Sequence, residues 1–303
     1  METLQQKLSI QLPSPLQRLS LRWQNAEQYS LFIKRDDLIH PIVSGNKWRK
    51  LSSALQQATN CNINRIGSFG GGYSNHIHAL AYCCHTLGLQ CTAFIRGDYS
   101  GNETPMLSDI ANWNTRIVYL NKEAYKRRAD TAYIEQLTRE YSLERMIPEG
   151  GSHGDCLTGM HELLTELPQP FDYMVLPVAS GGTLAGLATG VSEVNKLLGV
   201  AVLKGQGYLE NLVDDLIDPL PVATPFTITH DFHCGGYAKS TDALRRFCNE
   251  FSNDTGIPVE PVYSGKTLYA LKQLIEQGFF PAGSQIVVLH TGGIQADREK
   301  EHL

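Results

Sequence analysis

Short apolar runs alternate along the chain with longer segments whose apolar residues recur at helical spacing. The short runs have the length and the composition of buried strands. They occupy residues 31–33, 65–69, 89–95, 173–178 and 284–290. The alternation predicts an α/β fold in which parallel sheets are covered by helices on both faces.

The longer segments predict helices at definite places. One helix is expected between Ser74, a suitable N-cap, and Gly88, a suitable C-terminal stop. Residues 122–141 predict a single amphipathic helix with a charged outer face. Further helices are expected at residues 155–166 and 183–198.

The length of 303 residues allows one large domain or two medium ones. No internal repeat, low-complexity segment or Gly/Ser linker marks a boundary. Glycine and proline cluster near residues 51 and 150. If the chain forms two domains, we expect it to cross between them at these two places.

Composition and charge exclude several classes of protein. A net charge of -5 argues against nucleic acid or an anionic membrane as a main partner. No secretory signal and no bilayer-spanning apolar run is visible. The seven cysteines form no CxxC pair and the ten histidines form no HExxH pattern, so we expect a reducing cytosol and no metal site.

The segment "PVASGGTLAGL", residues 177–187, follows a strand candidate and opens a helix. Its residues Ser180, Gly181, Gly182 and Thr183 present backbone N–H groups that suit an anion at a helix N-terminus. The segment matches neither the Walker A nor the GxGxxG pattern, which disfavours nucleoside triphosphates and dinucleotides. A tight strand-to-helix turn without a ligand is the alternative reading.

The segment "SFGGGYSNHIHAL", residues 68–80, places three glycines before a predicted helix start. Close approach of a ligand to this backbone is possible because glycine has no side chain. Ser74, Asn75 and His76 at the helix start are candidates for binding a substrate carboxylate. Helix capping by Ser74 is the alternative.

Three further side chains are candidates for chemistry. Lys47, in "SGNKWRKL", stands at a predicted helix start, where a cation has the wrong sign for the helix dipole. Desolvation there would make its amine nucleophilic, although lysines often extend into solvent. Tyr263 follows a short extended stretch, and Thr291 lies at the end of a buried strand, where α/β sheets place ligands. The alternatives are a turn before a helix for Tyr263, which the residues alone favour, and a strand-end turn at Gly292 and Gly293 for Thr291.

Together, one amine, one phosphate cradle, one carboxylate-binding helix start and one strand-end hydroxyl are the parts that a pyridoxal phosphate enzyme needs. The chain also resembles the pyridoxal-phosphate enzymes of the 1-aminocyclopropane-1-carboxylate deaminase and D-cysteine desulfhydrase family. The resemblance is carried by "PSPLQRL", "FIKRDDL", "SGNKWRKL", "GGGYSNH", "PEGGSHG", "ASGGTLAG", "EPVYSGK" and "LHTGG", which span nearly the whole chain.

The resemblance implies roles toward pyridoxal 5'-phosphate. Lys47 is the implied Schiff-base residue and proton shuttle, and Lys50 is the implied phosphate contact. The turn from Ser180 to Leu184 is implied to cradle the phosphate through its N–H groups. The remaining implied cofactor contacts are Asn75 at the 3'-oxygen, Thr291 at the ring nitrogen, and Ser264.

The resemblance also implies roles toward the substrate, a small amino acid. The implied carboxylate binders are Ser74, Asn75 and His76, with Ser74 also an acid/base candidate. Tyr263 corresponds to the active-site tyrosine of the family. These roles, with Lys47, make up the expected catalytic set.

Two positions separate the branches of the family. Deaminases resemble "PVYEG" and "SNQ", whereas this chain has Ser264 and His76 at those places, as the desulfhydrases do. We therefore expect β-elimination from D-cysteine to give pyruvate, ammonia and sulfide. Deamination of 1-aminocyclopropane-1-carboxylate is the alternative within the family. A protein that binds pyridoxal phosphate or senses an amino acid, with little turnover, is the alternative from another class.

The implied architecture is the two-domain tryptophan-synthase-β-like fold, also called fold type II. The larger domain is expected from residues 1–50 and 150–303, and the smaller domain from residues 51–149. A homodimer in the cytoplasm is what the resemblance implies. Neither nucleic acid nor membrane is an expected partner.

Overall fold

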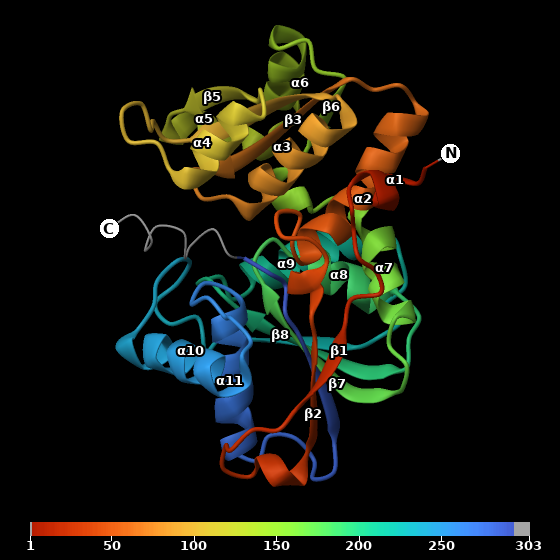
Figure 1. Ribbon diagram of the computed structural model, residues 1–303, viewed down its shortest axis with the longest axis vertical. Coiled ribbons are helices and arrows are strands. Elements are labelled where there is room, and N and C mark those ends of the chain that lie inside the picture. The colour runs from red at the N-terminus through yellow and green to blue at the C-terminus, as the bar shows by residue number, and fades with distance from the viewer. Residues whose placement is uncertain (1, 294–303) are drawn as a thin grey trace.

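A computed structural model describes residues 2–293 as two sheets with helices on both faces (Figure 1). The larger sheet has the strand order β1-β2-β10-β7-β8-β9, and only the β1–β2 pair is antiparallel. Its strands are β1 (Leu16–Leu19), β2 (Ser30–Lys34), β10 (Gln285–Leu289), β7 (Phe171–Val178), β8 (Val194–Ala201) and β9 (Phe226–Thr229).

The smaller sheet is parallel throughout and has the order β5-β4-β3-β6. Its strands are β5 (Arg116–Leu120), β4 (Gln90–Arg96), β3 (Arg65–Gly71) and β6 (Arg145–Ile147). All four lie between residues 65 and 147, whereas the larger sheet takes strands from both sides of that segment. The predicted α/β class with helix-covered parallel sheets is confirmed.

The helices divide between the two sheets. Around the smaller sheet lie α2 (Asn46–Asn60), α3 (Asn75–Leu87), α4 (Pro105–Asn112), α5 (Lys122–Lys126) and α6 (Thr131–Glu140). Around the larger sheet lie α7 (Cys156–Thr165), α8 (Gly182–Thr189), α9 (Tyr208–Ile217), α10 (Asp242–Thr255) and α11 (Ser264–Glu276). The short α1 (Leu4–Lys7) and the 3-10 turns η1 (Ala26–Gln28), η2 (Asp36–Leu38), η3 (Arg127–Ala129) and η4 (Glu149–Gly151) complete the set.

The predicted division at residues 50/51 and 149/150 stays a prediction. The first of these boundaries falls inside α2, which runs unbroken from Asn46 to Asn60. This helix packs on α3 beside the smaller sheet and on α7 beside the larger one. It therefore joins the two halves and carries Lys47 and Lys50 between them.

Two helix predictions need correction. The segment 183–198 is not one helix, because α8 ends at Thr189 and β8 begins at Val194. β8 lies between β7 and β9, and its buried apolar residues fit a central parallel strand. The segment 122–141 is also interrupted, because the Asp130 side chain accepts a hydrogen bond from the Tyr133 N–H and starts α6 as a separate helix.

The helix predicted from Ser74 to Gly88 is confirmed as α3. The Ser74 Oγ accepts from the N–H of Ile77, and Gly88 ends the helix with a φ of 73°. Local capping chemistry and left-handed glycine were enough to fix both ends.

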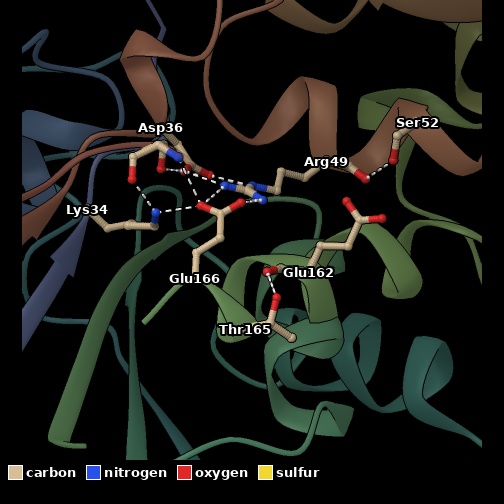
Figure 2. A network of polar contacts seen from close by, with 8 residues as sticks. Lys34, Asp36, Arg49, Ser52, Glu162, Thr165 and Glu166 are labelled. Atoms are coloured by element: carbon tan, nitrogen blue, oxygen red, sulfur yellow. Dashed lines mark hydrogen bonds and ion pairs between the residues drawn. The ribbon is translucent and has the colours of Figure 1, made fainter. Parts of the chain in front are cut away.

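A buried ionic network anchors α2 to the larger sheet (Figure 2). Arg49 Nη2 lies 2.9 Å from Asp36 Oδ1, and its Nη1 lies 2.7 Å from Glu166 Oε1. Lys34 Nζ lies 2.5 Å from Glu166 Oε2. Two cations thus face two anions, which balances charge in a region where an unpaired ion would be costly.

None of the helices within residues 2–293 is long and apolar enough to cross a membrane.

Candidate active site

A cavity of about 1070 Å³ opens at the carboxyl ends of strands from both sheets. Residues just after β3, β6, β7, β8 and β10 line it, as do the starts of α2, α3 and α8. Parallel α/β sheets place ligands at this end of their strands. Most of the predicted site residues line this cavity, namely Lys47, Lys50, Ser74, Asn75, His76, Ser180, Gly181, Thr183, Leu184, Tyr263 and Thr291.

Lys47 is the second residue of α2 and points into the cavity. Its Nζ donates to Asn46 Oδ1 at 2.8 Å, and Asn46 Nδ2 in turn donates to Thr183 Oγ1 at 2.9 Å. Burial, together with the charge of Lys50, lowers the pKa of Lys47 to about 7. A large share of this amine is therefore neutral and nucleophilic at neutral pH.

Gly45 makes this helix start possible. A Cβ at Gly45 would lie 1.7 Å from the carbonyl oxygen of Thr291, and its φ is +64°. Only glycine lets the start of α2 pass so close to the end of β10. The contact brings Lys47 and Thr291 to the same cavity.

A second group of residues forms an anion cradle. Lys50 Nζ lies 3.1 Å from Ser152 Oγ and 3.4 Å from Ser180 Oγ, and the two hydroxyls are 2.7 Å apart. Burial lowers the pKa of Lys50, although the neighbouring Cys156 opposes this effect. An anion between these groups would replace the hydration that Lys50 has lost.

The start of α8 completes the cradle. Its N-cap, Gly181, has a φ of +78° and no side chain to cap the first-turn amides, which leaves them for a ligand. A Cβ at Gly182 would lie 2.7 Å from Ser152 Oγ, so larger residues would fill the space. Gly182 itself does not line the cavity and instead lets α8 approach Ser152 and Cys156.

The start of α3 forms another wall of the cavity and includes His76. Ser68 Oγ donates to the carbonyl oxygen of Ile147, so His76 Nε2, 2.8 Å from the same hydroxyl, must be the donor in their contact. Burial and the charges of Lys47 and Lys50 hold the pKa of His76 well below its ordinary value.

The proton on Nε2 leaves His76 Nδ1 as a buried acceptor with no hydrogen-bond partner among the described residues. In this tautomer Nδ1 is an acceptor, which suits an N–H or O–H group rather than a carboxylate. The carboxylate-binding role predicted for His76 stays a prediction. A carboxylate can still use the first-turn N–H groups of α3, beside Ser74 and Asn75.

Tyr263 and a residue that the sequence did not reveal form a pair of phenols. The hydroxyls of Tyr263 and Tyr237 lie 2.8 Å apart, and both residues line the cavity. Burial, and then the Tyr237 hydroxyl, raise the pKa of Tyr263 well above its ordinary value, so the pair stays protonated at neutral pH. The only local signal for Tyr237 was "CGGY", a glycine pair before an aromatic residue.

Ser264 is not among the residues that line the cavity, although its neighbour Tyr263 is, and its predicted contact with the cofactor stays a prediction. Its side chain is 1% exposed, and its hydroxyl is 3.3 Å from His290 Nδ1. The turn before it is held by Glu260, whose carboxylate accepts from the N–H groups of Val262, Tyr263 and Ser264. Sequence reasoning also missed this role of Glu260, which fixes the backbone that carries Tyr263.

Trp48 and Tyr73, two bulky residues beside predicted site residues, differ in their surroundings. Trp48, next to Lys47, is buried in the core and does not line the cavity. Tyr73, before Ser74, is 40% exposed and does line it.

The cavity mouth is positively charged. Glu149 is the one carboxylate among the described residues that line the cavity, and it is bound by Arg128 and by the Tyr125 hydroxyl. Arg96 and Lys204 also line the cavity. Such a mouth favours the approach of anions, including a phosphate. Residues 2–293 contain no group of three or more His, Cys, Asp or Glu side chains that could hold a metal ion.

The chain matches one family model, described as pyridoxal-phosphate dependent enzyme, over residues 9–292. A protein of Pyrococcus horikoshii, provisionally named a 1-aminocyclopropane-1-carboxylate deaminase, is 32% identical over 87% of this chain and 84% of its own length. The bifunctional mitochondrial D-cysteine desulfhydrase/1-aminocyclopropane-1-carboxylate deaminase of Arabidopsis thaliana is 28% identical over 93% of this chain and 77% of its length.

Among solved structures, one described as an ACC deaminase homologue aligns with a TM-score of 0.79. The alignment covers 99% of each chain at 25% sequence identity.

Proposed function

The chain belongs to the family of pyridoxal-phosphate dependent enzymes, and from this premise we propose that it catalyses β-elimination from a small amino acid, with D-cysteine as the preferred substrate. D-cysteine and water would give pyruvate, ammonia and hydrogen sulfide. The observation that carries the proposal is Lys47, an amine with a pKa of about 7, in one cavity with the anion cradle and the Tyr263–Tyr237 pair.

The residues of the cavity fit pyridoxal 5'-phosphate, the cofactor of the family. Lys50, Ser152, Ser180 and the first-turn amides of α8 would hold its phosphate, because they combine a buried cation, two hydroxyls and unpaired N–H groups. When bound, the cofactor supplies a carbonyl for amines and a ring that withdraws electrons from the substrate's α-carbon. Thr291 stays the predicted partner of the ring nitrogen.

Lys47 and the start of α3 would act on the substrate. The α3 amides, with Ser74 and Asn75, would hold the substrate carboxylate at the positive end of the helix. As a free amine with a pKa of about 7, Lys47 Nζ can accept the α-proton without first losing one to solvent. The acid/base role predicted for Ser74 stays a prediction, because its Oγ caps α3 through Ile77 N–H.

The phenol pair would assist the leaving group. A raised pKa keeps the Tyr263 hydroxyl protonated, so it can donate to the sulfur as the carbon–sulfur bond breaks. Tyr237 can return a proton to Tyr263 through their 2.8 Å contact. Proton transfer by a positioned group typically contributes about 10²–10⁴-fold in rate.

The preference for D-cysteine rests on Ser264, a neutral residue at the position where the deaminase motif "PVYEG" has a glutamate. A carboxylate there would keep the ring nitrogen protonated and strengthen electron withdrawal. Ser264 is neutral, lies outside the cavity and faces His290, and Glu149 is occupied by Arg128 at the mouth. We infer that this weaker withdrawal suffices for β-elimination, which removes an α-hydrogen, more readily than for opening a cyclopropane ring.

The test is product release from a panel of amino acids by the protein loaded with cofactor. We expect pyruvate and sulfide from D-cysteine, with a higher kcat/KM than for any other substrate. The panel would include L-cysteine, D-serine and 1-aminocyclopropane-1-carboxylate. Ammonia from the cyclopropane substrate at the higher kcat/KM would instead support the second candidate, a deaminase, which is the activity named for the Pyrococcus horikoshii relative. Binding of amino acids without release of a keto acid from any of them would overturn both.

A further inference from the structure

Lys266 is a fully buried lysine in the first turn of α11, and the proposed reaction does not use it. Its side chain is 0% exposed, and its Nζ donates to the carbonyl oxygens of Val202 at 2.9 Å and Gly236 at 2.8 Å. No described carboxylate forms an ion pair with it. A buried ammonium at the positive end of a helix is unfavourable, so its two hydrogen bonds must serve a particular geometry.

The two carbonyls belong to different parts of the cavity wall. Val202 directly follows β8, a central strand of the larger sheet. Gly236 belongs to residues 230–241, which connect β9 to α10 without a helix or strand. Lys266 therefore ties an irregular segment to the rigid end of the sheet.

The first half of the irregular segment is held by other contacts, because His230 Nε2 lies 2.7 Å from Glu210 Oε1 and Phe232 and Cys234 pack against the core. Glycine tolerates the positive φ angles at Gly235 and Gly236, but the positive φ angles at Cys234 and Ala238 are disfavoured, so this backbone path needs contacts with other elements to hold it. Within its middle part, residues 235–239, two hydrogen bonds reach other elements of the described chain. They are Lys266 Nζ to Gly236 O and the contact between the Tyr237 and Tyr263 hydroxyls.

Both ties end on the first turn of α11 or the residue just before it, and Gly236 is the immediate neighbour of Tyr237. We propose that Lys266 is a positioning residue that clamps Gly236 to the end of β8 and so holds the Tyr237 hydroxyl against Tyr263. The inference rests on the proposed function only for the consequence of this clamp, which is proton supply to the leaving group.

The first arm of the test needs no substrate. Lys266→Met in the cofactor-loaded protein removes both hydrogen bonds while keeping the length of the side chain. Because hydrogen bonds to charged groups are among the stronger ones, amide exchange at residues 233–239 should rise by about tenfold or more. Exchange in β7 and α10 should be unchanged. Lys272→Met, farther along α11 where Lys272 pairs with Glu276, is the matched control and should leave residues 233–239 as they were.

The second arm asks whether Lys266 acts through Tyr237. We expect Lys266→Met and Tyr237→Phe each to lower kcat by about tenfold or more, since general-acid assistance is of this order or larger. The double variant should be no slower than Tyr237→Phe alone, because a phenol that is absent cannot be mispositioned. Losses that multiply would overturn the proposal, as would unchanged exchange in Lys266→Met.

A third arm covers the case in which Lys266→Met does not fold. In Tyr237→Phe the clamp is intact, so exchange protection of residues 235–236 should persist. Loss of that protection would show that the phenol pair, and not Lys266, holds the segment. If no amino acid yields a keto acid, the proposed function fails while the exchange measurements still decide the clamp.

Discussion

Lys47 shows how a single residue gains reactivity from its surroundings. Its amine lies in the cavity wall, its hydrogen bond goes to the neutral oxygen of Asn46, and the charge of Lys50 acts on it. Burial and Lys50 both disfavour the charged form, and no described carboxylate forms an ion pair with it to oppose them. The same features that make the amine reactive cost the fold stability, as is common at functional sites.

The lowered pKa of the Lys47 amine can be measured directly in the cofactor-free protein. Acetylation of Lys47 by acetic anhydride, followed by peptide mass spectrometry across a pH series, should show a midpoint near pH 7 because only the neutral amine reacts. Lys50→Met should move the midpoint upward, since it removes one of the two causes of the shift. Lys126, an exposed residue on α5, provides the reference rate. A midpoint that Lys50→Met leaves unchanged would refute the stated electrostatics.

At this scale the sequence revealed which residues gather but not their protonation or orientation. Lys47, Lys50, Asn75 and Thr291 all reached the cavity because each belongs to a motif at a strand or helix end. The tautomer of His76 could not be predicted from its motif, because it depends on a contact of Ser68, in the same motif, with Ile147, which is distant in sequence. Tyr237 was missed because its segment has no periodic pattern that would predict a position.

Among the elements, α2 is the one on which the site depends. Arg49, between Lys47 and Lys50 in sequence, points away from the cavity into the network of Figure 2. The neighbouring helix α7 packs closely against α2, because a Cβ at Gly159 of α7 would lie 1.9 Å from the carbonyl oxygen of Arg49. Ionic contacts and close packing thus fix α2, and with it both lysines.

The network should make stability depend on pH. Burial alone would raise the pKa of Glu166, but hydrogen bonds and charge from Arg49 and Lys34 outweigh it and lower the pKa below 4.5. The carboxylate therefore stabilises the fold above pH 4.5, and this contribution is lost as pH falls through the lowered pKa. Glu166→Gln should reduce the free energy of unfolding by about 3 kcal/mol at pH 7, with a shrinking difference below pH 4.5.

Urea unfolding from pH 3 to pH 7 is the measurement for Glu166→Gln. Glu135→Gln, which breaks an exposed pair with Arg139, is the control and should have little effect at any pH. A Glu166→Gln loss that is constant across this range would contradict the assignment.

The packing of α2 on α7 gives a separate prediction. Gly159→Ala should reduce the free energy of unfolding by about 1–3 kcal/mol through overpacking, and so lower the melting temperature. By displacing Arg49 it should also weaken cofactor binding. Gly154→Ala adds the same methyl group where nothing lies within 4 Å, and should be close to neutral. Equal melting temperatures for the two variants would show that α2 can shift freely.

The element-scale predictions succeeded where local signals were strong. Both ends of α3 followed from Ser74 and Gly88. The stretch from 183 to 198 failed because apolar residues continue from α8 into β8, and a fully buried strand has no alternation to distinguish it from a buried helix.

For the whole molecule, the cavity is where strands from both sheets end. Its ligand should therefore stabilise the fold as a unit. At a free concentration of 100 times its dissociation constant, pyridoxal 5'-phosphate should increase the free energy of unfolding by about 2.7 kcal/mol. Pyridoxal, which lacks the phosphate, should raise the melting temperature less than pyridoxal 5'-phosphate does. In Lys50→Met the two compounds should raise the melting temperature by more similar amounts. Equal shifts from both compounds in the unmodified protein would argue that the cradle binds no phosphate.

The global arrangement could be predicted only in part. Strand–helix alternation was enough for the α/β class, but strand order depends on contacts between distant segments, such as β2 with β10. The order β1-β2-β10-β7-β8-β9 brings Lys47 and Thr291, from opposite parts of the chain, to one place. No local pattern encodes that meeting, although the motif resemblance implied it.

The most direct test of the account is to locate the cofactor on the chain. The protein, loaded with pyridoxal 5'-phosphate, would be treated with borohydride, digested and mapped by mass spectrometry, with Lys47→Ala treated in parallel. We predict that the reduced cofactor is attached at Lys47 and that Lys47→Ala carries none. Attachment at Lys50 or another lysine, or equal labelling of Lys47→Ala, would contradict the central claim that Lys47 is the reactive amine.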